Sequence, residues 1–364
     1  MQNKSINDFF EGLTDSRSAR NQRHPFLSII TLGILAVIAG IDSFSGIGDF
    51  AEAHLEELSR VLDLPNGAPS HDTIRRVFDL LDPVAFHQCF MDFTRAIAQQ
   101  QSQFIAIDGK EVCNGPLNPL RLVSAWCSAN QVTLAQTKVH DKSNEITAIP
   151  ELLKLLDLSG TIVTIDAMGC QKDIAKAIID QEADYVLALK DNHKTLCEDV
   201  AAYFNDLKLF DGYYWQELDK GHGRIEQREC YVTDAIDYVQ QHHSWSGLRS
   251  IALVIAKRTI KDKTTTERRY YISSLPPNAE LIARAARMHW EIENKLHWRL
   301  DVIFNEDKAC IRNENAAENM ALLRKWALNL LTQHKGKSSI KSLQRKASMS
   351  FKFLLSLLNQ VFHA

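Results

Sequence analysis

The chain has 364 residues, of which 45% are hydrophobic and 24% are charged, the balance of an ordinary globular protein. That length is enough for two domains, or for one domain with a large insertion. The net charge of -3 excludes a globally basic nucleic-acid binder, so any DNA-binding surface has to be local.

The seven cysteines favour a reducing compartment. Their number is odd and no two form a C-x-x-C pair, which argues against a disulfide framework and against a zinc knuckle. The longest apolar stretch, residues 26–41, has 16 residues and contains Ser28 and Gly33, whereas a membrane-spanning helix needs about 20 apolar residues. We interpret it as a buried helix and expect no membrane contact.

Residues 1–100 are predicted to form a helical N-terminal domain. Apolar residues recur at helical spacing through residues 29–39, 47–58 and 73–81. Residues 69–72, Pro-Ser-His-Asp, supply N-cap candidates for the helix that begins near Thr73. A further helix is expected over residues 83–100.

The pattern changes at Phe104, where alternating strands and helices begin. Strands are predicted up to Asp108 and over residues 121–127, 132–140, 161–165 and 185–189, and helices over 145–156, 171–181 and 193–204. Three strands followed by alternating helices and strands predict an α/β fold with a mixed sheet.

The C-terminal half begins with a strand-rich segment. Strands are predicted over residues 213–218, 226–233, 251–259 and 269–273, which indicates a β-rich insertion at about 208–276. Helices follow over 279–300, 314–332 and 338–361. We therefore divide the chain into the helical domain 1–100, a domain over 101–335 that contains the insertion, and a basic C-terminal helix over 336–364.

Two aspartates share one sequence setting. Asp108 follows the apolar run Phe-Ile-Ala-Ile, and Asp166 follows Ile-Val-Thr-Ile. A carboxylate at the end of a buried strand lies at the edge of the sheet, where α/β folds place their ligands. Two adjacent carboxylates repel each other unless a cation lies between them, and an all-oxygen site suits Mg²⁺ or Mn²⁺.

Such a site usually takes a third acid, and several follow on the long C-terminal helix and beyond it. On a helix, Glu291 shares one side with Arg287, and Glu293 shares another with His289 and His297. Spacing alone does not choose among the candidates, which are Glu291, Glu293, Asp301, Glu306 and Asp307.

The ordered motifs resemble the H-repeat-associated insertion-sequence transposases, which are DDE transposases. The motifs are RHPFLSI at 23–29, PSHDTIRRVF at 69–78, IDGK at 107–110, KSNEI at 142–146, TIDAMG at 164–169, LALKDNH at 187–193, HGRIEQR at 222–228 and HWEIENKLHWRLDVIFNED at 289–307. The resemblance covers most of the chain. It implies an RNase H-like catalytic core and a transposase-associated domain at the N-terminus.

The resemblance also selects the third acid. The pattern Trp-x-Ile-Glu falls on Glu293, so it implies that Asp108, Asp166 and Glu293 are the catalytic, metal-binding triad. Wider relatives carry a tyrosine, an arginine and a lysine where this chain has Ala286, His289 and Leu300. A second departure is Glu111-Val112-Cys113 after IDGK, where the family pattern leads us to expect a basic residue.

The resemblance implies two Mg²⁺ or Mn²⁺ ions, about 3.5–4 Å apart, that support DNA strand cleavage and strand transfer at the element ends. Its alternatives are a nuclease of the same fold that does not join ends, and an inactive DNA-binding descendant. The implied partner is double-stranded DNA, both the terminal inverted repeats and the target, bound by a homodimer or multimer in the cytoplasm, in association with the nucleoid. The predicted DNA contacts are Lys110, Lys190, His222, Arg224, Arg228, Arg287, Lys295 and His297.

Tryptophans near these segments have two interpretations. Trp215 is a candidate for stacking on an unpaired base, although local core packing is the commoner role of such a residue. We interpret Trp290 and Trp298 as packing residues of the helix that carries Glu293.

Overall fold

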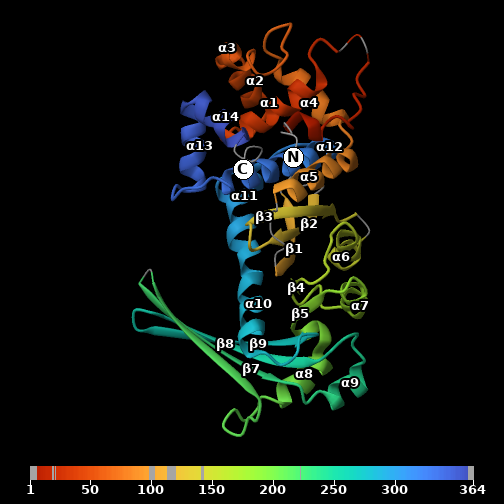
Figure 1. The fold of residues 1–364 in the computed structure, drawn as a ribbon, viewed down its shortest axis with the longest axis vertical. Coiled ribbons are helices and arrows are strands. Elements are labelled where there is room, and N and C mark those ends of the chain that lie inside the picture. Colours follow the sequence, from red (N-terminus) through yellow and green to blue (C-terminus); the bar gives the residue numbers. More distant parts are fainter. Residues whose placement is uncertain are drawn as a thin grey trace.

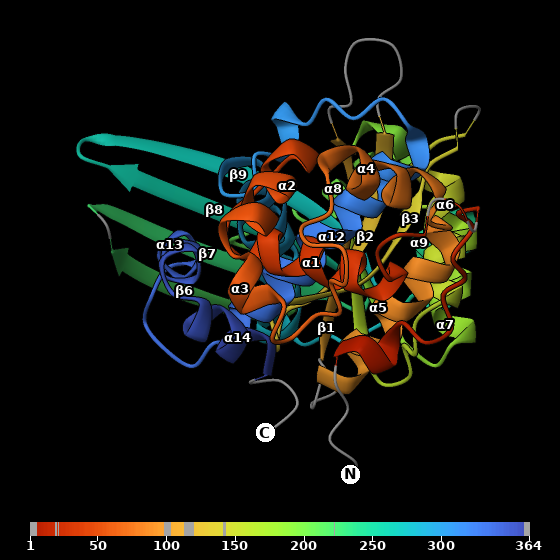
Figure 2. The same ribbon diagram turned by 90° about the horizontal axis from the view of Figure 1, so that it is seen from above.

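The structure is a computed structural model that describes residues 6–18, 20, 22–97, 103–112, 120–140, 143–221 and 223–359. Helices gather at one end of an elongated molecule, and a long sheet runs to the other end, where two β-hairpins project from the body (Figures 1 and 2). None of the described helices is both long enough and apolar enough to span a membrane.

The first part of the chain is helical, as the apolar spacing predicts. The apolar stretch forms the buried helix α1, with 12 of its 13 residues buried. Ser70 is the N-cap of α4, because its side chain accepts a hydrogen bond from the backbone N–H of Thr73 at 3.4 Å. The elements are η1 (Ile6–Phe9), α1 (Phe26–Ile38), α2 (Phe44–Ala53), α3 (Leu55–Leu58), α4 (His71–Leu80) and α5 (Pro83–Ile97).

The sheet confirms the mixed α/β fold. Its nine strands lie in the order β3-β2-β1-β4-β5-β9-β8-β7-β6. β1 pairs parallel with β4, and β4 with β5, while the other neighbours are antiparallel. The strands are β1 (Phe104–Val112), β2 (Leu120–Cys127), β3 (Val132–Lys138), β4 (Ile162–Ile165), β5 (Asp184–Leu189), β6 (Tyr213–Gly221), β7 (Arg224–Thr233), β8 (Ser250–Ile260) and β9 (Lys263–Ser273).

The four strands of the predicted β-rich segment extend the same sheet instead of forming a separate one. β9 begins six residues earlier than predicted, since a turn at Lys261, with φ of 53°, closes β8 and β9 into a tight hairpin. Pairing with β8 thus draws the polar residues 263–268 into a strand, although their side chains give no apolar signal. Trp215 packs against the cluster between this sheet and α10 (Ala279–Glu291), so it belongs to the core.

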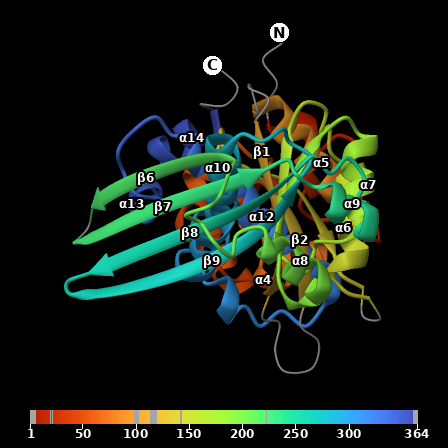
Figure 3. The same cartoon turned by 90° about the horizontal axis from the view of Figure 1, so that it is seen from below.

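Helices cover both faces of the sheet, and the sheet lies between two apolar cores, one on each face. One face carries α6 (Glu145–Lys154), α7 (Lys172–Asp180), η3 (Asp191–His193), α8 (Lys194–Ala202) and α9 (Asp237–His243), the last of which was not predicted. The other face carries α10, which runs from the strands β6–β9 toward the helical end of the molecule (Figures 1 and 3).

The helix predicted over residues 279–300 is interrupted. After α10 the chain forms a π-helical turn, η4 (Ile292–His297), and then α11 (Trp298–Val302). π-helical turns inside α-helices are rare and occur frequently at functional sites. A further short turn, η5 (Glu306–Lys308), leads to α12 (Glu314–Thr332), which has the predicted bounds.

The single helix predicted over residues 338–361 is two helices, α13 (Ile340–Met349) and α14 (Phe351–Asn359). Ser350 separates them because its backbone is extended and its hydroxyl accepts a hydrogen bond from the N–H of Phe353 at 3.3 Å. Both helices share an apolar core with α1, α4, α5 and α12, so the N-terminal and C-terminal helices pack together.

Candidate active site

Asp108 lies inside β1 and not at its end, which corrects the sequence-based expectation. The strand continues to Val112 because β2 pairs with it from Ile105 to Val112. Ile107 and Ile165 are partners in the parallel pairing of β1 with β4, and both point into the core under α6 and α7. Since side chains alternate along a strand, Asp108 and Asp166 lie in the next row, on the opposite face, under α10.

Asp166 directly follows β4, as predicted, and its own turn holds it. Its Oδ1 accepts hydrogen bonds from the backbone N–H groups of Met168 at 3.1 Å and Gly169 at 3.3 Å. A Cβ at position 169 would lie 2.3 Å from the Ile165 side chain, so this turn needs glycine. The second carboxylate oxygen of Asp166 is not used by these bonds.

The turn η4 positions Glu293 and separates it from Glu291. Glu291 forms an ion pair with Lys295 at 2.5 Å, which binds the two side chains to each other. Glu293 is exposed and faces the row that holds Asp108 and Asp166. Of the candidate acids that spacing left open, Glu293 is the one that lines the pocket shared by Asp108 and Asp166.

Asp108, Asp166 and Glu293 line one pocket of about 270 Å³ between α10, η4 and the strands β1, β4 and β5. Three carboxylates that share a small concave surface offer the oxygen ligands that Mg²⁺ and Mn²⁺ prefer. Among the described residues, Asp108, Glu293 and His297 also form a group whose ligand atoms lie within 4.8 Å of one another. The donor set thus fits divalent ions.

Two groups close to these acids were not among the predicted site residues. His289 on α10 lines the pocket, and its Nδ1 lies 3.3 Å from the Thr164 hydroxyl. Burial lowers the pKa of His289, although the charges of Asp108 and Asp166 act in the opposite direction. The second group is Glu145, which sits inside the motif KSNEI.

Glu145, the first residue of α6, adds a fourth carboxyl close to Asp108 and Asp166. Burial, and then the charges of Asp108 and Asp166, raise the pKa of Glu145. A Cβ at Gly109 would lie 2.1 Å from its carboxyl carbon, so the glycine of the IDGK motif makes room for this side chain. The KSNEI motif at 142–146 contains Glu145, but the sequence alone does not show that this glutamate lies near the two aspartates.

Three of the predicted DNA contacts form ion pairs with acidic residues of the protein itself. Lys110 is 11% exposed and forms ion pairs with Asp301, Glu306 and Asp307, so its position does not suit DNA contact. Lys295 pairs with Glu291. The ring of His297 is buried beside Asp108, and the side chain is 5% exposed.

Three other predicted contacts gather around one carboxylate. Arg224, Arg228 and Arg287 all form ion pairs with Glu226, at 2.8 Å for Arg224 and 3.7 Å for Arg287. Lys190 is exposed and lines the rim of the acidic pocket. His222 lies outside the described residues.

A basic groove continues from the acidic pocket over β7, β8, β9 and α10. Its volume is about 340 Å³, and it contains Arg228 and Arg287 together with three cations that the sequence interpretation missed, Lys257, Arg258 and Arg269. In the sequence, these cations belong to two pairs of adjacent basic residues, at 257–258 and 268–269, that could have pointed to the groove. Strand pairing brings both pairs next to α10.

Trp290 lies where the groove and the pocket meet, and it corrects the packing interpretation. Its side chain lines both hollows, with an exposed fraction of 42%, and the Arg269 guanidinium lies 4.1 Å from its ring centre. Trp298 is likewise 52% exposed. The two rings face outward because they lie on the side of the helix opposite Ile292 and Leu296, which are buried.

Comparison with protein families defines the class. The family described as "Transposase DDE domain" matches residues 102–330, and the family described as "DDE_Tnp_1-associated" matches residues 7–94. A domain match over more than half of the chain, on a mixed sheet with an acidic pocket, makes this protein a DDE transposase by class.

Individual relatives define the subgroup. The chain is 39% identical to the "H repeat-associated putative transposase YhhI" of Escherichia coli strain K12, over 98% of both chains. It is 40% identical to the "Putative protein YbfL" of the same strain, again over 98% of both chains, and 38% identical to the "Putative transposase YncI" of Escherichia coli O157:H7 over 95% of this chain and 92% of that one. The chain therefore belongs to the H repeat-associated family of DDE transposases.

A solved structure is also similar. The piggyBac transposase, in a synaptic complex with hairpin DNA, matches 99% of this chain and 78% of its own, with a TM-score of 0.46 and 12% sequence identity.

Proposed function

We propose that this chain cleaves DNA at the ends of an insertion sequence and joins those ends to target DNA, with Asp108, Asp166 and Glu293 as the catalytic carboxylates. The observation that supports it is the pocket that all three acids line. Two divalent ions, Mg²⁺ or Mn²⁺, would activate the attacking oxygen and stabilise the leaving oxygen there. Phosphoryl transfer depends mainly on positioning and charge neutralisation, and a rigid strand pair with a helix across it supplies the positioning.

Each acid has a distinct structural support for this role. Asp108 is held by pairing with Ser124 of β2, one residue after the pairing of β1 with β4 ends, and Asp166 is held by the two N–H groups of its turn. Glu293 comes from the η4 turn and lies across the pocket from them. Removing one carboxylate therefore removes a ligand without removing the scaffold.

The basic groove is the proposed path of the DNA backbone next to the cleavage site. Arg228 and Arg287 line it, Arg224 shares their partner Glu226, and Lys190 stands at the pocket rim. Phosphate contacts of this kind position a duplex without reading its sequence. The proposed partners are the terminal inverted repeats and the target, bound by a homodimer or multimer in the cytoplasm.

A strand-transfer assay tests the proposal. Purified protein, DNA that carries the inverted repeats flanking the gene, and Mg²⁺ should yield nicked ends and then joined products. Asp108→Asn and Glu293→Gln should each lower both products by at least about 100-fold, by analogy with the loss of other preorganised charge-stabilising groups.

Glu291→Gln is the matched control, because this neighbouring glutamate is paired with Lys295 outside the pocket. It should retain most of the activity. Undiminished joining by either active-site variant would refute the assignment. Cleavage without joining would instead indicate a nuclease of the same fold, and DNA binding without any cleavage would indicate an inactive descendant.

A further inference from the structure

His297 is a buried imidazole without a hydrogen-bond partner. The residue is 4% exposed, and among the described residues neither ring nitrogen makes a hydrogen bond. Buried polar groups in folded proteins are nearly always paired, and an unpaired one calls for a specific explanation. The proposed function does not use this side chain, and its burial removes it from the surface that DNA would contact.

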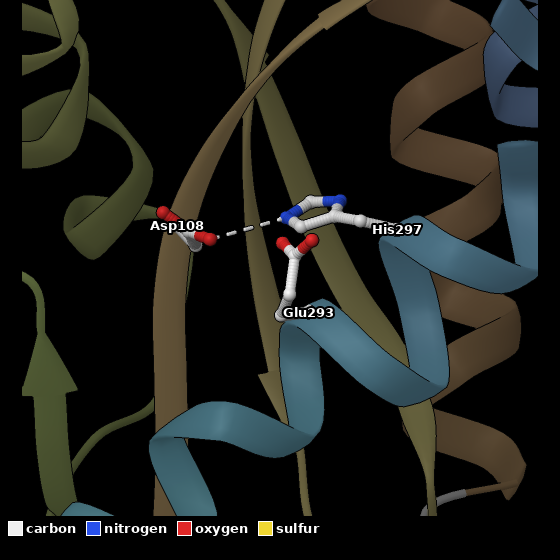
Figure 4. A group of neighbouring side chains, drawn as sticks. All are labelled: Asp108, Glu293 and His297. Carbon is white, nitrogen blue, oxygen red and sulfur yellow. Dashed lines mark ion pairs between the residues drawn. The ribbon is translucent and has the colours of Figure 1, made fainter. Parts of the chain in front are cut away.

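The ring points at two of the proposed metal ligands. Its Nε2 lies 3.5 Å from the Oδ2 of Asp108, and Figure 4 shows the Glu293 carboxylate beside the same nitrogen. The ligand atoms of the three residues all lie within 4.8 Å of one another. Glu293 and His297 come from the same π-helical turn, which places both side chains toward β1.

These distances suit a shared ion. Ligand atoms about 2.0–2.2 Å from one ion are separated by no more than about 4.4 Å. The pair of Asp108 and His297 already satisfies that limit. A small rotation of the exposed Glu293 side chain brings the third ligand atom within it.

We propose that His297 is a direct metal ligand, so that Asp108, Glu293 and His297 form one ion subsite of nitrogen and oxygen donors. This inference rests on the proposed function and adds to it a ligand and a metal preference. Imidazole favours transition ions, whereas Mg²⁺ prefers oxygen ligands. The subsite should therefore bind Mn²⁺ more tightly than Mg²⁺, while Asp166 faces the pocket from the other side as an oxygen donor.

The test is direct detection of nitrogen at the bound ion. The full-length protein is loaded with one equivalent of Mn²⁺, and pulsed electron paramagnetic resonance reads the coupling between Mn²⁺ and ¹⁴N. The wild type should show this coupling, and uniform ¹⁵N labelling should change it to the ¹⁵N pattern. That comparison needs no substitution, so it does not depend on how a variant folds.

Substitutions then assign the nitrogen. His297→Gln replaces the imidazole by an amide oxygen, so it should abolish the coupling and weaken Mn²⁺ binding at least about tenfold, with less than about a threefold change for Mg²⁺. His289→Gln is the matched control, since this half-buried histidine on the preceding helix α10 lies by Thr164, outside the group of three ligands. It should retain the coupling.

The outcomes separate this inference from the proposed function. If Mn²⁺ binds in a way that Asp108→Asn abolishes but shows no nitrogen coupling, His297 is only an ion-pair partner of Asp108 and the inference is wrong, while the carboxylate site stands. Coupling lost in His289→Gln and kept in His297→Gln would also overturn it. If neither ion binds in a way that depends on Asp108, the proposed function fails as well.

Discussion

Glu306 is the centre of a buried charge network that joins the strand of Asp108 to the helical end of the molecule. Its side chain is fully buried, and its carboxylate lies 3.1 Å from the Lys110 ammonium and 3.9 Å from the Arg324 guanidinium. Burial raises the pKa of Glu306, but the charges of Lys325, Lys110 and Arg324 outweigh it and hold the pKa below its ordinary value. Glu306→Gln would leave three cations without this counter-charge in the interior.

Removing one partner of a buried ion pair costs about 3–5 kcal/mol, so we expect Glu306→Gln to lower the free energy of unfolding by that amount. The total free energy of unfolding of a typical protein is about 5–15 kcal/mol, so this would be a large share of it. Asp307→Asn is the matched control, because Asp307 faces the same Lys110 at 3.7 Å but is 58% exposed. Its loss should cost less than about 1 kcal/mol.

Urea unfolding of the wild type and both variants, followed by circular dichroism, measures the difference. Because Lys110 lies two residues after Asp108 on β1, Glu306→Gln should also reduce cleavage more than Asp307→Asn does. If the free energy of unfolding of Glu306→Gln lies within about 1 kcal/mol of the wild-type value, the network does not stabilise the fold and this reasoning is wrong.

Three further predictions concern other parts of the chain. Burial, with a smaller effect of Lys325, lowers the pKa of His87 to about 4, so the unfolded chain takes up more protons between pH 6.5 and 4. Stability should therefore fall by roughly 3 kcal/mol as the pH drops through that window, and urea titrations at several pH values should find a smaller loss in His87→Gln. Trp326 is fully buried among phenylalanine rings in the helical core, so Trp326→Ala should lower the free energy of unfolding by about 3–5 kcal/mol. An unchanged urea midpoint would contradict this. Arg287→Ala should reduce the salt dependence of DNA binding by about one counterion, measured by fluorescence anisotropy between 50 and 200 mM salt, whereas Lys172→Ala, an exposed lysine on α7 across the sheet, should leave the slope unchanged.

Most elements could be predicted from the sequence because local spacing and burial agree in them. The buried helix α1 and the long helix α12 carry their own apolar periodicity, and β4 is a short apolar run with Asp166 directly after it. The prediction was wrong where pairing or packing overrides local signals. Residues 263–268 are polar, and they form a strand only because β8 lies alongside them.

By itself, the sequence predicted the mixed α/β order, the family and Asp108 and Asp166 as a pair of carboxylates, and the family resemblance selected Glu293, because these depend on short segments and on the order of motifs. The pocket that Glu293 shares with the two aspartates, the ion pair of Lys110 with the buried Glu306 and the orientation of His297 toward Asp108 depend on tertiary structure. Ideal helical spacing could not decide them, since a π-helical turn rotates each side chain that follows it. The partners in question are also separated by more than 120 residues of chain, a distance that only folding closes.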